Sequence, residues 1–198
     1  MTDSRESKGP SQFTKRVNSQ AGSILTLDDP GDWERATRGK IAEHPTGAIA
    51  GPLGGIAWNT ADFDFMREQE QSPDSVHPSL WRHGRLNAVH GLFEVAPGVW
   101  QCRGYDLSNI TFIKGKNGWI VIDPLTTAVT AAACLELANQ HLGARPVTAV
   151  LYTHSHADHY GGILGVTTRE DVEAGNVRIL APEGFLREAV SENLLAGP

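Results

Sequence analysis

An apolar, β-branched segment that runs directly into a histidine-rich turn constrains this chain more than any other feature of its sequence. The segment, residues 147–152, has the composition of a buried strand. Three histidines and one aspartate follow closely: His154, His156, Asp158 and His159. In an extended segment the side chains of His154 and His156 leave the backbone on the same side, because side chains alternate along a strand.

The spacing of these four side chains predicts a site for two metal ions. Asp158 and His159 follow where the chain turns, so we expect them to reach a point next to the one that His154 and His156 reach. Imidazole and carboxylate groups are the ligands of Zn²⁺ and related first-row metals. We expect the glycines at 161–162 to let the backbone come close to the ions. The alternative, a polar surface turn, does not explain so many ligands at fixed offsets.

The segments before this turn predict a sheet with a crossover helix. Residues 110–113 and 119–122 are apolar and flank Asn117-Gly118, a pair typical of a β-hairpin because both residues accept positive φ. An apolar stripe at helical spacing occupies residues 128–142. Strand, helix, strand and ligand turn form a βαβ unit, which places ligands at the carboxyl ends of strands. The predicted fold class is therefore α/β.

Composition and charge narrow the class of protein. The 198 residues are 40% hydrophobic and 20% charged, as in an ordinary globular protein. A net charge of −6 without a basic cluster argues against a nucleic-acid partner. Cys102 and Cys134 are too few for a disulfide framework and too far apart for a metal knuckle, so we predict two buried thiols. The chain shows no apolar segment of signal-peptide or membrane-span length, which predicts a cytoplasmic protein.

The remaining segments carry weaker signals. Residues 1–27 are polar and predict a flexible arm, and Asp32 is the predicted N-cap of a short helix. Residues 47–55 predict a structured loop, because they lack the Gly-Lys-Ser/Thr ending of a phosphate loop. After the ligand turn, residues 167–176 predict a loop, followed by a strand and a helix. Three further histidines have no ligand spacing and are interpreted as structural: His77, His83 and His90.

The order His-x-His-x-Asp-His after a strand resembles the signature of the metallo-β-lactamase superfamily. Further segments resemble its alkyl/aryl-sulfatase branch, the linear alkyl sulfatases that degrade detergents: Trp81 and residues 86–95, 106–111, 123–126 and 181–185. The resemblance runs from about Asp32 to the last residue. It implies an αββα sandwich of which this chain holds the amino-terminal half. Residues 28–91 would then be a lead-in that packs on the catalytic domain, and residues 92–198 the first part of an incomplete metallo-β-lactamase-like domain.

This resemblance also implies an activity, which is hydrolysis of alkyl sulfate esters by hydroxide held between two Zn²⁺ ions. Enzymes of that branch take two more carboxylates, a further histidine and their sulfate-binding side chains from beyond the point where this chain stops. The 198-residue chain alone is therefore expected to lack a complete site, and the longer enzyme is expected to be a homodimer. Two alternatives stay open: another hydrolase of the superfamily, acting on a thioester, lactone or β-lactam, and a chain without catalytic activity.

Asp123 allows two interpretations. It directly follows the apolar residues 119–122, and an acidic residue at such a place is often only a turn former. The resemblance implies instead that Asp123 lies under the metal site and orients the ligand turn, as an outer partner of the ligands.

Overall fold

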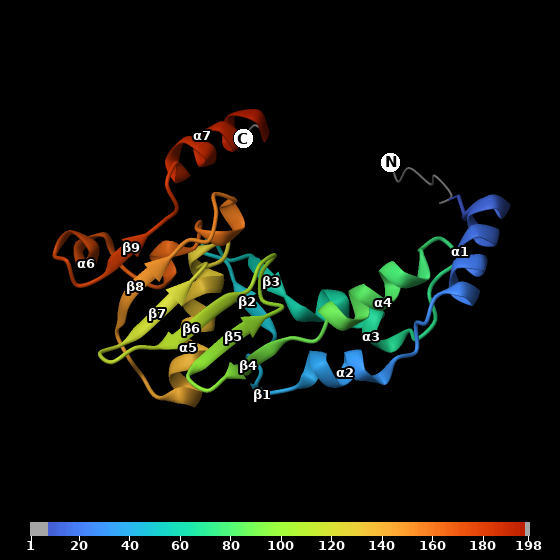
Figure 1. Ribbon diagram of the computed structural model, residues 1–198, viewed down its shortest axis with the longest axis horizontal. Coiled ribbons are helices and arrows are strands. Elements are labelled where there is room, and N and C mark those ends of the chain that lie inside the picture. The colour runs from blue at the N-terminus through green and yellow to red at the C-terminus, as the bar shows by residue number, and fades with distance from the viewer. Residues whose placement is uncertain (1–7, 197–198) are drawn as a thin grey trace. The chain divides into compact units, whose positions relative to one another are not determined.

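The computed structural model describes residues 8–196, which form two compact units (Figure 1). The first unit holds the described residues up to Ala36 together with Phe63–Ala88, and the second holds Thr37–Asp62 and the chain from Val89 onward. Part of the predicted lead-in therefore belongs to the second unit, because one of its strands pairs with the large sheet. Whether residues 1–27, 28–91 and 92–198 are separate domains stays a prediction.

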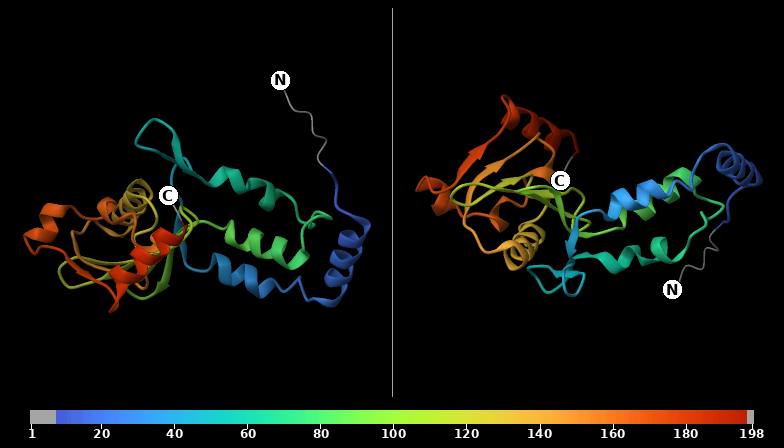
Figure 2. Two further views of the ribbon diagram at one scale, coloured as in Figure 1. Left: turned by 90° about the horizontal axis from the view of Figure 1, so that it is seen from above. Right: turned by 60° about the horizontal axis from the view of Figure 1, so that its bottom comes forward.

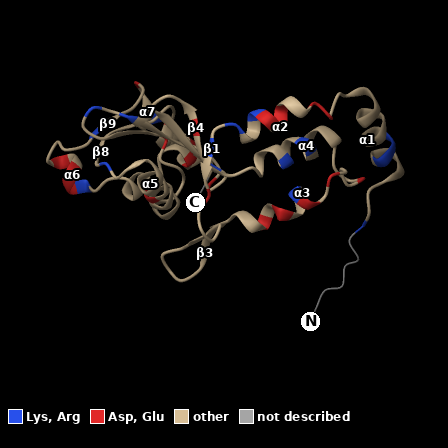
Figure 3. Ribbon diagram, turned by 90° about the horizontal axis from the view of Figure 1, so that it is seen from below, with Lys and Arg blue, Asp and Glu red and all other residues tan. Residues whose placement is uncertain are grey.

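The first unit is helical. Its helices are α1 (Gln12–Ile24), α2 (Pro30–Thr37), α3 (Asp64–Glu68) and α4 (Pro78–Asn87). Trp81 of α4 is buried, and its indole N–H donates to the carbonyl of Gln69 at 3.1 Å. Acidic and basic residues are interspersed on α2 and α3 (Figure 3). Hydrogen bonds from Arg35 and Arg82 lower the pKa of Asp32.

Two expectations for this unit need correction. Part of the predicted arm is the helix α1, which Ser11 caps by accepting a hydrogen bond from the amide of Thr14 at 3.1 Å. The flexibility of the arm stays a prediction, and residues 1–7 lie outside the described residues. Helix α2 begins before Asp32, because the Asp29 carboxylate accepts the amide of Gly31 at 2.9 Å. Asp32 is therefore inside the helix and is not its N-cap.

A seven-stranded sheet organises the second unit (Figure 1). Its strands, in spatial order, are β1 (Lys40–Ala42), β4 (Gly91–Ala96), β5 (Val99–Arg103), β6 (Ile110–Lys114), β7 (Trp119–Ile122), β8 (Val147–Leu151) and β9 (Arg178–Leu180). The pairs β7–β8 and β8–β9 are parallel, and the other pairs are antiparallel. β2 (Ala48–Ala50) and β3 (Ile56–Asn59) form a separate hairpin, so the structured loop expected over residues 47–55 contains a strand and the turn of this hairpin. η1 (Thr60–Phe63) follows it.

The predicted hairpin of β6 and β7 is confirmed, but its physical reason differs from the one expected. Neither Asn117 nor Gly118 has a positive φ. A Cβ atom at Gly118 would lie 2.2 Å from the carbonyl oxygen of Pro146. The glycine is therefore required by the close approach of the segment that leads into β8.

Helix α5 (Ala128–Leu142) makes the crossover between β7 and β8 and packs on one face of the sheet (Figure 2). Thr127 caps it by accepting the amide of Thr130, and Gly143 ends it at φ 91°. The core between helix and sheet is built from buried side chains that include Leu92, Phe112, Trp119, Val121, Ala131, Leu137 and Val150. Cys102 and Cys134 lie in it as free thiols, as predicted.

The chain after β8 forms short helices. They are η2 (Ala157–His159), η3 (Ile163–Gly165), α6 (Arg169–Glu173) and, after β9, α7 (Phe185–Ala196). The loop expected over residues 167–176 is partly helical, because Thr168 caps α6 by accepting the amide of Asp171 at 3.1 Å. The α/β class predicted from the sequence is confirmed. Within residues 8–196, no helix is both long and apolar enough to cross a membrane.

The turn between η2 and η3 generates a stability prediction. A Cβ atom at Gly162 would lie 2.0 Å from the carbonyl oxygen of Pro124, and backbone cannot give way as a flexible side chain does. We expect Gly162→Ala to lower the free energy of unfolding by about 1–3 kcal/mol in urea titrations. The control is Gly55→Ala, where no heavy atom lies within 4 Å of the added Cβ. Equal unfolding midpoints for the two variants would contradict the packing argument.

Candidate metal centre

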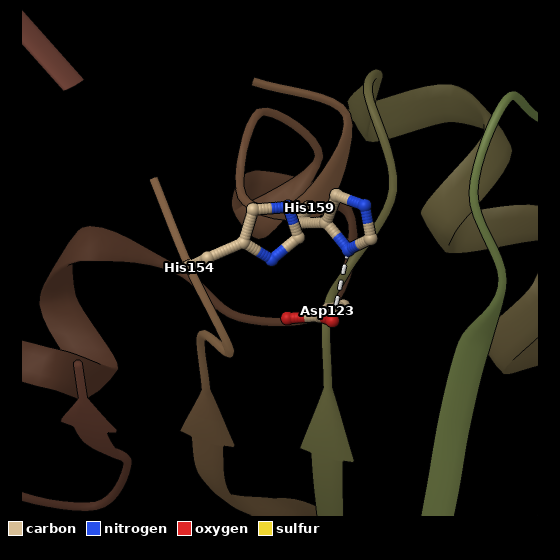
Figure 4. A group of neighbouring side chains, drawn as sticks. All are labelled: Asp123, His154 and His159. Carbon is tan, nitrogen blue, oxygen red and sulfur yellow. Dashed lines mark hydrogen bonds and ion pairs between the residues drawn. The ribbon is translucent and has the colours of Figure 1, made fainter. Parts of the chain in front are cut away.

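The ligand turn and Asp123 meet at the carboxyl ends of β7 and β8. Asp123 follows β7, and the turn that carries His154 follows β8. Because β7 and β8 are parallel neighbours, their carboxyl ends lie side by side. Figure 4 shows the carboxylate of Asp123 beneath the imidazole rings of His154 and His159.

Asp123 is buried and serves as an acceptor for the ligand turn. Its Oδ1 accepts the amide of Thr153 at 2.8 Å, and its Oδ2 accepts the Thr153 hydroxyl at 2.6 Å. Oδ2 also lies 2.9 Å from Nδ1 of His159 (Figure 4). The backbone of Asp123 adopts φ 53°, which is uncommon for a residue with a side chain and occurs at sites where surrounding contacts enforce it.

These hydrogen bonds determine which imidazole nitrogens carry protons. Nδ1 of His159 must donate, because the carboxylate of Asp123 only accepts. The single hydroxyl proton of Thr153 goes to Asp123, so Thr153 can only accept from Nδ1 of His154, at 2.9 Å. In the neutral form of each ring Nε2 therefore keeps its lone pair free, and this is the form that binds a metal.

The acceptor atoms converge. Nε2 of His159 lies 3.2 Å from Oδ2 of Asp158. Ligand atoms of Asp123, His154 and His159 lie within 4.8 Å of one another. Lone pairs that face each other at such distances repel unless a cation or a proton lies between them. The donor set of imidazole nitrogen and carboxylate oxygen fits Zn²⁺ or a similar ion.

The structure separates the four predicted ligands into two groups. His154 and His159 form one group with Asp123, which the resemblance placed behind the ligands, and Asp158 lies beside this group through its contact with His159. The His156 side chain is exposed, and its Nε2 lies 3.6 Å from Oε1 of Glu192 on α7. Its ring remains near the site, with its centroid 4.6 Å from that of His154.

The glycines of the turn lie close to the backbone of another loop, and their expected role beside the ions stays a prediction. A Cβ atom at Gly161 would lie 2.4 Å from the carbonyl oxygen of Thr126, and Gly162 is hemmed in by Pro124. The amide of Gly162 also donates to the carbonyl of Leu125 at 2.8 Å. The ligand turn is thus pressed against the loop that joins β7 to α5.

Helix α7 covers part of the turn. Phe185 stacks on Tyr152 with ring centroids 5.2 Å apart, and Asn193 donates to the hydroxyl of Tyr160 at 3.2 Å. Burial raises the pKa of Tyr152 to about 12, so this phenol stays neutral. A cavity of about 520 Å³ lies between α7 and the turn, lined by residues that include Ser155, His156, Glu188, Ser191 and Glu192.

Several residues at the site carried no assigned role in the sequence analysis. Thr153 bridges Asp123 and His154, and Glu192 faces His156. Asp106 and Ser108, between β5 and β6, bond to the loop before α5 and to the ligand turn. For Asp106 and Ser108 the only sequence signal was the resemblance of residues 106–111 to the alkyl sulfatases.

Comparison with protein families gives a match to the metallo-beta-lactamase superfamily over residues 103–197. A linear primary-alkylsulfatase of Pseudomonas sp. is 45% identical over 190 residues, which are 96% of this chain and 28% of the relative. An alkyl/aryl-sulfatase of Saccharomyces cerevisiae is 44% identical over 184 residues, or 93% of this chain and 28% of the relative. The chain thus spans less than a third of the curated relatives that it matches.

A solved structure supports the same relation. The stereoselective inverting sec-alkylsulfatase of Pseudomonas sp. superposes with a TM-score of 0.89 at 44% sequence identity. The match covers 97% of this chain and 30% of the solved chain. Both units described above therefore have counterparts within one related protein.

The contacts of Asp123 generate a prediction about metal affinity. Asp123→Asn keeps the shape of the side chain but removes its charge and one acceptor for the donors of Thr153 and His159. We expect Zn²⁺ affinity, measured by competition with a chromophoric chelator, to fall about 10- to 100-fold. The control is Asp28→Asn, an exposed aspartate of the first unit. Matching titration curves for wild type and Asp123→Asn would leave Asp123 as a turn former.

Proposed function

Because the chain is homologous over almost its whole length to alkylsulfatases, we propose that it forms the metal-binding part of a metal-dependent hydrolase of alkyl sulfate esters. The observation that carries this proposal is the convergence of imidazole nitrogens and carboxylate oxygens at the ends of β7 and β8. A polar surface turn has no reason to direct these atoms at one another, whereas a metal site requires it.

We propose that the residues hold two Zn²⁺ ions, with His154 and His156 at one ion and Asp158 and His159 at the other. When bound, the ions lower the pKa of a water molecule and offset the negative charge of a sulfate ester. The carboxylate of Asp123 keeps Nδ1 of His159 protonated, so that the ring presents Nε2 to the ion. Asp123 thereby fixes both the tautomer and the orientation of a ligand.

The cavity beside α7 does not supply a sulfate site. Glu188 and Glu192 line it, and their carboxylates repel an anionic ester. That the side chains that bind sulfate lie beyond this chain, as the sequence resemblance implies, stays a prediction. A homodimer of the longer enzyme likewise stays a prediction.

The alternative activities have less support. Hydrolysis of a thioester, lactone or β-lactam would fit the superfamily match over residues 103–197, but the alkylsulfatase relatives also match the helical residues before it. The second alternative is a chain without catalytic activity. It is expected if residues of a longer protein do not complete the metal site of this chain. A chimera separates these possibilities.

The chimera replaces the aligned segment of the Pseudomonas sp. linear primary-alkylsulfatase by this chain. We expect sulfate release from a medium-length alkyl sulfate to persist, and His159→Ala within the chimera to reduce it at least about 100-fold, because one ligand of the site is lost. The control is His83→Ala, an exposed histidine of α4. Equal losses from the two substitutions would refute the ligand assignment, and a folded but inactive chimera would favour the non-catalytic alternative.

The isolated chain generates a second prediction. Two tetrahedral ions need more ligands than His154, His156, Asp158 and His159 supply. We therefore expect the purified chain to retain fewer than two equivalents of zinc after dialysis, as measured by elemental analysis. Two tightly held ions per chain would show that the site is complete within these residues.

A further inference from the structure

The segment between β5 and β6 makes a hydrogen bond to the ligand turn, from Ser108 to the backbone of Asp158. We propose that Ser108 is a positioning residue for Asp158, and that Asp106 fixes Ser108 in place. This inference rests on the proposed function, in which Asp158 is a metal ligand. It assigns a role to two buried polar side chains that do not themselves reach the metal site.

Ser108 bonds directly to the backbone of the ligand. Its side chain is buried, and its hydroxyl donates to the carbonyl oxygen of Asp158, a residue fifty positions later in the chain. Within the turn, the amide of His159 donates to the carbonyl of His156, and the amide of Gly161 donates to that of Ala157. These bonds join residues within the turn that contains η2, whereas Ser108 connects the Asp158 peptide to the segment between β5 and β6.

Asp106 makes that attachment rigid. Its carboxylate is buried and accepts four hydrogen bonds, from the amide of Leu107 (2.7 Å), the amide and hydroxyl of Thr126 (3.2 and 2.5 Å) and the hydroxyl of Thr130 (2.5 Å). Thr130 lies in the first turn of α5, so Asp106 ties its own segment to the start of that helix. On the other side of Ser108, the fully buried Ile110 begins β6.

The consequence is that Asp158 is held at its backbone while its carboxylate faces His159 at 3.2 Å. Metal affinity depends on the orientation of each ligand, and removal of a partner that fixes this orientation typically costs about 10- to 100-fold in affinity. Without the Ser108 hydroxyl, the Asp158 peptide can rotate, and the carboxylate loses its fixed direction. The effect on metal affinity should therefore act through Asp158.

The test uses Co²⁺ as the probe, because its visible absorption reports ligand geometry. We expect Ser108→Ala to weaken Co²⁺ binding to the whole chain about 10-fold and to alter the visible spectrum. The control is Ser72→Ala, which removes a similar hydroxyl-to-carbonyl bond, 2.8 Å to Val76, in the first unit. This variant should bind Co²⁺ with the affinity and spectrum of the wild type.

A double-mutant cycle separates positioning from general loosening. If Ser108 acts through Asp158, Ser108→Ala should cause no further loss of Co²⁺ affinity in an Asp158→Ala background. An equal loss in both backgrounds would overturn the inference. So would an unchanged affinity in the Ser108→Ala single variant.

A measurement on the metal-free chain keeps the inference apart from the proposed function. We expect Ser108→Ala to speed hydrogen exchange at the amides of His159 and Gly161, and to leave the amide of Val121 in β7 unchanged. If the wild-type chain binds no Co²⁺, these residues do not form a metal site by themselves, and exchange alone decides the role of Ser108. Unchanged exchange at His159 and Gly161 would then refute it.

Discussion

The carboxylate of Asp123 is the contact on which the rest of the site depends. It joins the ends of two parallel strands by accepting the amide and hydroxyl of Thr153 and the imidazole N–H of His159. A buried carboxylate is costly unless donors surround it, so these three bonds stabilise one arrangement of the turn over all others. The same bonds select the tautomers of the ligand rings, which links the packing of the sheet to metal chemistry.

Close backbone packing supports this contact from the other side of the turn. Gly162 faces the carbonyl of Pro124, and its amide donates to the carbonyl of Leu125. The turn can approach the loop before α5 this closely only because residue 162 is a glycine. Asp106 holds that loop through Thr126 and Thr130. The ligand turn is therefore packed against the loop before α5, and this loop is itself hydrogen-bonded to Asp106. These contacts explain how a short turn can keep several ligand atoms in place.

Local patterns predicted a large part of the fold. The hairpin of β6 and β7, the limits of α5 and the strand before the ligand turn follow from alternation, helical spacing and capping residues. Local reasoning was wrong where a few polar side chains decide the structure. Ser11 and Thr168 cap helices in segments that were expected to be an arm and a loop, and Asp29, not Asp32, accepts an amide of the first turn of α2.

The sequence by itself determined which residues are available for metal binding and which strand delivers them, because the identity and spacing of ligands are local properties. Only the tertiary structure decided how these residues are arranged. It set the protonated nitrogen of His154 and His159, turned His156 toward Glu192, and placed Ser108 behind Asp158. These relations join segments that are far apart in the chain, and hydrogen bonds between such segments exist only after the sheet and α5 have packed.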